Sequence, residues 1–229
     1  MNPAETQSGK SKLYTWLAVA VLAQLAFWYY SMPRPQLDGA TGLTANALCC
    51  LWAVVSLMLV PLTCATLIHK KSLTDLGLGL GDFTFGWKAI AIMGPLFALG
   101  TWVGSSDPQI QAFYPMPGDE VGSSASKLST WWAAYLTYYI AFEFFYRGYL
   151  IRSIDESTIR QRFRNPAFVL IGFQSLCCFI IHIGKPTAEL WASLPASIAF
   201  GWMAWRSNSI WYGLVIHFAV GIINDVGAM

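Results

Sequence analysis

A glutamate and an arginine inside a long apolar run are the residues of this sequence best suited to chemistry. Glu143 and Arg147 interrupt the apolar run 131–150. Each charge costs about 2.5–3.5 kcal/mol to insert into hydrocarbon. Because they are four residues apart, they share one helical face and can pair. The pair is either part of a functional site or a structural ion pair that joins one helix to its neighbour, and the other polar groups at membrane depth decide between these readings.

Two histidines also lie within apolar runs. His182 ends the run 175–183, and His217 lies within the run 210–223. A lone histidine in a membrane more often forms an interhelical hydrogen bond than an active site. Together with Glu143 and Arg147, however, these histidines put polar side chains on three separate segments, which favours one shared site.

The chemistry that these residue types allow is activation of a water molecule. A buried carboxylate can act as general base, and a histidine can polarise a carbonyl group or stabilise an oxyanion. A metal ion held by Glu143, His182 and His217 is conceivable. The sequence has no HExxH pattern, so no cofactor is expected. It also has no GxSxG motif and no phosphate-binding loop.

The composition defines the class of protein in which these residues lie. Of the 229 residues, 55% are hydrophobic and 11% are charged, with a mean hydropathy of +0.48. Soluble domains carry about 25% charged residues. We therefore expect a polytopic, all-α membrane bundle surrounded by lipid. The net charge of +2 gives no reason to expect nucleic acid as a partner.

The apolar runs divide the chain into about seven transmembrane segments, within a range of six to eight. We interpret residues 1–229 as a single integral membrane domain and residues 130–225 as its motif-bearing core. A short leucine- and glycine-rich segment, 72–81, is expected at the membrane interface. The expected spans are residues 13–31, 44–68, 85–104, 130–150, 166–183, 188–205 and 209–225.

The basic residues predict the orientation of these spans. Lys10 and Lys12, Lys70 and Lys71, the arginines between 152 and 164, and Arg206 all fall on one side, and the acidic loop 105–126 falls on the other. Basic loops stay in the cytoplasm. We expect a cytoplasmic N-terminus in a bacterial plasma membrane. In this arrangement Glu143 lies near mid-depth and His182 near the outer end of its span, a mismatch on the order of 10 Å that broken or re-entrant helices could remove.

Three stretches resemble the motifs of the CPBP intramembrane endopeptidases, which include the type II CAAX prenyl proteases and the bacteriocin-processing proteins. The run from Glu143 to Gly148 resembles the first motif, His182 the second, and residues 201–211 leading to His217 the third. The resemblance implies a glutamic-type membrane endopeptidase that cleaves a membrane-associated protein or peptide. It implies Glu143 as general base, His182 as its partner, His217 at the oxyanion and Arg147 as the charge that orients Glu143.

The sequence departs from the motifs of this family at three positions. The family commonly has a glutamate at the position of Phe142, and in the prenyl proteases that glutamate is thought to activate water. Cys178 stands where phenylalanine is common, and Gly221 where asparagine or aspartate is common. These departures keep two alternatives open. One is a non-catalytic member, such as an immunity or scaffold protein, and the other is a small proton-coupled transporter that uses the same residues as a proton relay.

Overall fold

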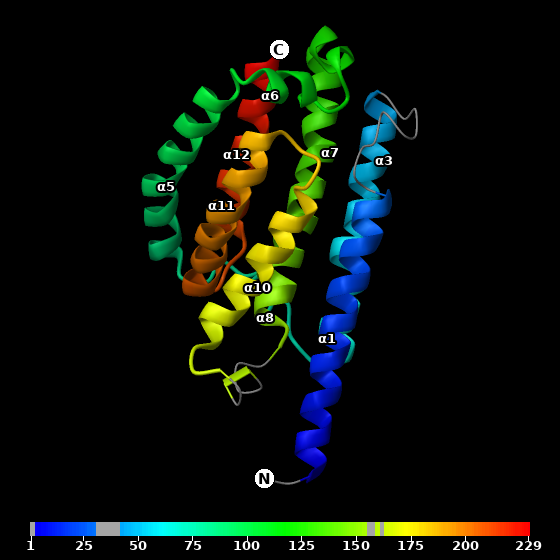
Figure 1. The fold of residues 1–229 in the computed structure, drawn as a ribbon, viewed down its shortest axis with the longest axis vertical. Helices are drawn as coiled ribbons and strands as arrows, with labels where there is room; N and C mark the ends of the chain where they lie inside the picture. The colour runs from blue at the N-terminus through cyan, green and yellow to red at the C-terminus, as the bar shows by residue number, and fades with distance from the viewer. Residues whose placement is uncertain (1–2, 31–41, 155–158, 161–162) are drawn as a thin grey trace.

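The computed structural model describes residues 3–30, 42–154, 159–160 and 163–229. Throughout these ranges the regular structure is helical, with no strand, as the composition predicted. The helices lie alongside one another in an elongated bundle (Figure 1). In chain order they are α1 (Pro3–Tyr30), α3 (Leu43–Ala53), η1 (Val54–Leu59), α4 (Val60–Leu67), α5 (Phe83–Gly104), α6 (Pro108–Phe113), η2 (Asp119–Ser123), α7 (Ala125–Glu143), η3 (Phe144–Tyr149), α8 (Leu150–Arg152), α10 (Pro166–Ile181), α11 (Thr187–Ser207) and α12 (Trp211–Ala228).

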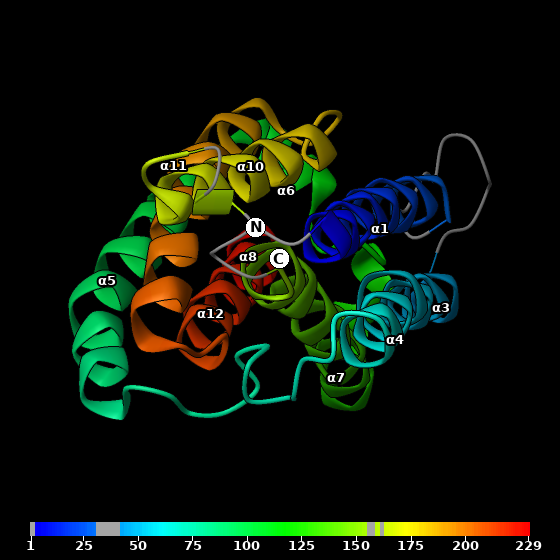
Figure 2. The ribbon, with the colours of Figure 1, turned by 90° about the horizontal axis from the view of Figure 1, so that it is seen from below.

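The helix α7, with its continuations η3 and α8, forms the centre of the bundle. On one side it contacts α1 and the continuous rod α3–η1–α4, and on the other it contacts α10, α11 and α12, with α5 outermost against α12 (Figure 2). Glu143 and Arg147 are both on this central rod. Their position explains how two charges can be kept away from lipid.

Within the described ranges, four helices are long and apolar enough to cross a membrane: Ser11–Tyr29, Leu43–Leu67, Phe83–Gly104 and Trp211–Ala228. The expected count of seven is not confirmed. The helix α10 is apolar but has only 16 residues. The helices α7 and α11 are longer, but their serine, tyrosine and tryptophan residues lower their hydropathy.

The segment 72–81 crosses the end of the bundle where the N-terminus lies (Figure 1). It is attached to the start of α12. Trp211 Nε1 donates to the carbonyl oxygen of Leu78 at 2.9 Å, and the Tyr212 hydroxyl donates to that of Leu80 at 2.6 Å. Backbone carbonyls without helical partners are thus satisfied by side chains, and the segment links the two halves of the bundle.

The turn between α10 and α11 is tied to the loop that carries α6. The backbone N–H of Thr187 donates to Gln109 Oε1 at 2.9 Å. At about 1.5 Å per residue, α10 is about 24 Å long, and it ends level with the middle of the central helix. The ring of His182 is 6.3 Å from that of Phe142. The short α10 thus removes the mismatch in depth that a full-length span would create.

Candidate functional site

The central helix changes its winding directly after Glu143. The helix is α-helical up to that residue and becomes a π-helix over Phe144–Tyr149. Short π-helical segments are rare and occur frequently at functional sites. Every residue of this segment is buried, including Arg147. A Cβ added at Gly148 would lie 2.8 Å from the carbonyl oxygen of Leu76, so glycine allows the segment 72–81 to pack directly against the π-helix.

Glu143 lies in contact with both Arg147 and His217. Its Oε1 accepts a hydrogen bond from His217 Nδ1 at 2.6 Å, and its Oε2 lies 3.4 Å from Arg147 Nε. The side chains of Glu143 and Arg147 are 0% and 1% exposed. A Cβ at Gly213 would lie 3.2 Å from Oε2 of the glutamate, so α12 approaches closely here. The helical pair expected from the spacing is present, and α12 adds a histidine to it.

The bond to Glu143 fixes the tautomer of His217. An ionised carboxylate can only accept, so Nδ1 carries the proton. The remaining nitrogen, Nε2, accepts when the ring is neutral and donates when it is protonated. The side chain of His217 keeps 18% of its surface exposed, whereas Glu143 keeps none. The imidazole, rather than the carboxylate, is therefore the accessible member of this pair.

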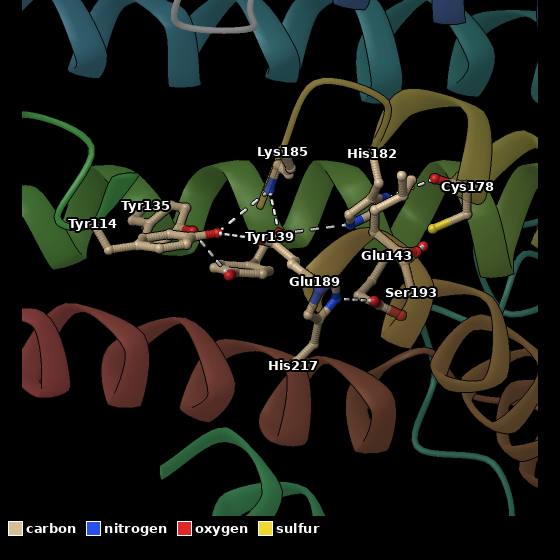
Figure 3. A network of polar contacts seen from close by, with 11 residues as sticks. Tyr114, Tyr135, Tyr139, Glu143, Cys178, His182, Lys185, Glu189, Ser193 and His217 are labelled. Carbon is tan, nitrogen blue, oxygen red and sulfur yellow. Dashed lines mark hydrogen bonds and ion pairs between the residues drawn. The ribbon is translucent and has the colours of Figure 1, made fainter. Parts of the chain in front are cut away.

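His182 lies beside a second glutamate, from the first turn of α11 (Figure 3). Its Nδ1 donates to the carbonyl oxygen of Cys178 at 2.7 Å, and its Nε2 lies 3.9 Å from Glu189 Oε1. Lys185 Nζ donates to the same carboxylate oxygen at 2.6 Å. The Tyr114 hydroxyl donates to Oε2 of the glutamate at 2.9 Å.

Phe142 packs against both histidines. Its ring centroid is 5.3 Å from that of His217 and 6.3 Å from that of His182, and its side chain is almost wholly buried. The Arg147 guanidinium lies 5.6 Å from the same ring. In contrast to the partnership that the resemblance implied, Glu143 contacts His217, and the carboxylate nearest to Nε2 of His182 in this network is Glu189.

The sequence analysis did not identify Glu189, Lys185 or Tyr114 as site residues. Lys185 falls in the short gap between the expected spans 166–183 and 188–205, and Glu189 falls at the start of the second of these spans. One signal was available, because Lys185 and Glu189 are four residues apart, the spacing of a helical ion pair. A carboxylate in the first turn of an otherwise apolar span was a second signal. The contact with Tyr114 is 75 residues away in sequence, and nothing local predicts it.

Several polar atoms of the site have no hydrogen-bond partner among the described residues. They are Glu143 Oε2 and two nitrogens of Arg147, Nε and Nη1. Buried polar atoms are usually satisfied, so these three atoms are exceptions within the packing around Glu143 and Arg147. Within the described ranges, no three His, Cys, Asp or Glu side chains are grouped as a metal site.

The fold and the site define an all-helical membrane protein with two glutamate–histidine pairs on neighbouring helices. Residues 124–223 match the family model described as "Type II CAAX prenyl endopeptidase Rce1-like". The matched part of the chain contains Glu143, Arg147, His182 and His217, and the match confirms the resemblance inferred from the motifs. Searches of curated proteins and of solved structures gave no significant match.

Proposed function

We propose that this protein is a membrane endopeptidase that hydrolyses a peptide bond of a membrane-associated protein or peptide with a glutamate-activated water. The observation that carries the proposal is the 2.6 Å bond between Glu143 and His217, next to Arg147, within a segment of the Rce1-like family. A charged glutamate and arginine are costly to bury, and a purely structural contact does not require a histidine beside them.

Glu143 acts on the reaction through His217. The carboxylate holds the ring in one tautomer and one orientation, as the aspartate does in serine protease triads. It also stabilises the protonated ring, whose Nε2–H can then donate to the oxyanion of the tetrahedral intermediate. Arg147 balances the charge of the glutamate in the buried part of the site.

Glu143→Gln tests this proposal. Glutamine preserves the shape of the side chain, but its amide can donate to Nδ1 and so hold His217 in the wrong tautomer. We expect a loss of cleavage of at least about a hundredfold per folded protein. Stability should also fall, because Arg147 is left buried without its carboxylate. Cleavage is measured on a farnesylated CAAX peptide and on the same peptide without lipid. In parallel, new protein termini are profiled in membranes of cells that express the wild type or the variant.

The matched control is Asp119→Asn, which neutralises an exposed carboxylate in η2. It should leave all cleavage unchanged. The endopeptidase function would be refuted if wild-type and Glu143→Gln membranes had the same set of protein termini and the wild type left both peptides intact.

A non-catalytic role is the second candidate, and the position of Phe142 favours it. An aromatic ring packs against both histidines at the position where the resemblance places a catalytic glutamate. In an immunity or scaffold protein, the polar pairs would only hold the helices together. This function predicts that Glu143→Gln changes stability and partner binding but leaves the set of protein termini unchanged.

A further inference from the structure

Glu189 is held as a carboxylate by two donors from different parts of the chain. Lys185 approaches one oxygen at 2.6 Å and the Tyr114 hydroxyl approaches the other at 2.9 Å. Burial, and then the neighbouring Glu189, raise the pKa of Tyr114 well above its usual value, so its hydroxyl keeps the proton that it donates. The side chain of Glu189 nevertheless keeps 17% of its surface exposed. An ion pair serving only to join helices would not need this accessibility.

His182 presents an acceptor to this carboxylate. The carbonyl oxygen of Cys178 can only accept, so Nδ1 carries the proton and the neutral ring offers Nε2 as an acceptor. The separation of 3.9 Å from Glu189 Oε1 is too long for a direct hydrogen bond. Two acceptors at this separation suit a water molecule that donates one hydrogen to each. Such a water has its lone pairs directed away from both groups.

We infer that Glu189 activates the attacking water together with His182, and that it replaces the glutamate that the family places at position 142. This inference rests on the proposed endopeptidase function and adds a catalytic residue to it. Glu189 comes from the first turn of α11 and lies next to His182 (Figure 3). The carboxylate is thus supplied by a neighbouring helix.

The reaction balances with these groups alone. One O–H bond of the water breaks, its proton passes to Glu189, and the oxygen attacks the carbonyl carbon. The carbonyl oxygen becomes an oxyanion next to His217. Collapse of the intermediate breaks the C–N bond, and the leaving nitrogen receives the proton back from Glu189. The products are a carboxyl terminus and a free amine.

Glu189→Gln and Glu189→Asp, compared in purified full-length protein, test this inference. Glutamine keeps the length of the side chain and can still accept from Tyr114, but it is a far weaker base. Aspartate keeps a carboxylate that is one methylene shorter. We expect kcat on the cleaved CAAX peptide to fall at least about a hundredfold for Glu189→Gln. For Glu189→Asp we expect a fall that is about ten times smaller.

The order of the two variants separates chemistry from packing. A structural role predicts that activity is lost only as far as folded protein is lost, because either variant changes the packing or the charge pair with Lys185. Activity of the folded glutamine variant equal to or above that of the folded aspartate variant therefore overturns the inference. If the glutamine variant does not fold, the aspartate variant still decides. The acid limb of the pH profile of kcat/KM should shift for Glu189→Asp, because a different carboxyl group titrates, and an unchanged limb overturns the inference.

A wild type without any cleavage refutes the endopeptidase function itself, whereas an active wild type with a fully active Glu189→Gln refutes only the role of Glu189.

Discussion

Each buried carboxylate of the site has its own cation four residues away. Glu143 is paired with Arg147, and Glu189 with Lys185. A buried pair is tolerated because the two charges offset each other, whereas a single remaining charge is strongly destabilising. At the scale of the residue, stability should therefore depend on keeping each pair matched rather than on either charge alone.

Arg147→Met tests this dependence. Removal of the guanidinium leaves Glu143 buried without its cation, and we expect a loss of about 3–5 kcal/mol in the free energy of unfolding. Adding Glu143→Gln to Arg147→Met should recover most of this loss, because neither charge then remains. Thermal unfolding in detergent measures both variants. A double variant no more stable than Arg147→Met would show that charge pairing is not what holds this part of the bundle.

The residue scale also shows how far the sequence could specify the site. The spacing of Glu143 and Arg147 predicted their contact, and the scarcity of polar groups in apolar runs pointed to His217. The partner of His182 could not be assigned from spacing, because Glu189 reaches it across a turn that the sequence places at the membrane surface. The packing of Phe142 against two rings depends on three helices and has no local signal.

At the scale of the element, a glycine face on α12 sets how closely it packs on the central helix. A Cβ at Gly221 would overlap the hydroxyl group of Tyr139, and one at Gly213 would lie 3.2 Å from Oε2 of Glu143. These glycines are eight residues apart, about two turns, and share one face. The family commonly has asparagine or aspartate at position 221. Here Tyr139, whose ring lies 4.7 Å from His217, occupies that space.

Gly221→Ala should separate α12 from the central helix. The added methyl group overlaps Tyr139, and we expect a loss of about 1–3 kcal/mol of stability and a loss of cleavage, because His217 moves with α12. The matched control is Gly172→Ala on α10, where a Cβ meets nothing within 4 Å. That change should be neutral or stabilise by about 0.5–1 kcal/mol. Equal melting temperatures for the two variants would contradict the close packing.

Asp82 connects the start of α5 with the end of α11. Its carboxylate accepts from the backbone N–H of Phe85 at 3.0 Å and from Arg206 Nη1 at 2.9 Å. First the backbone bond and then the arginine lower the pKa of Asp82. Its contribution to stability is therefore present above the pKa of an unfolded aspartate, about 3.9, and is lost as the pH falls through the lower value in the folded protein.

Asp82→Asn isolates this charge, because asparagine also caps helices well. Melting temperatures are measured for both proteins between about pH 6 and pH 3, which spans the pKa of an ordinary aspartate. The wild type should be the more stable near pH 6, and the difference should shrink as Asp82 becomes protonated. A difference that stays constant with pH would show that the carboxylate contributes through shape alone.

At the scale of the whole molecule, hydropathy predicted the type and approximate place of the elements but not their neighbours. The expected span 85–104 is observed as Phe83–Gly104, and 166–183 as Pro166–Ile181. The central place of α7 was not predicted, because its polar residues make it a weak span by hydropathy. The same residues suit it to the interior, where Trp131 and Trp132 donate to Asp225 of α12 at 2.8 and 3.1 Å.

The arrangement of the ends allows the orientation in the membrane to be tested. The N-terminus and α8 lie at one end of the bundle, and the C-terminus and α6 at the other (Figure 1). We expect the arginine-rich end, which includes Arg152 and Arg164, to be cytoplasmic, because basic loops are retained there. Asp107 and Asp119 should then face the opposite side.

Single-cysteine labelling of intact cells distinguishes the two orientations. The background lacks the native cysteines, which are Cys49, Cys50, Cys64, Cys177 and Cys178. Arg164→Cys and Asp119→Cys each place one thiol at an exposed position, at opposite ends. A membrane-impermeant maleimide should label only Asp119→Cys in intact cells and both variants after lysis. Labelling of Arg164→Cys in intact cells would invert the orientation and place the loop that supplies Tyr114, and with it the Glu189–His182 pair, nearer to the cytoplasm.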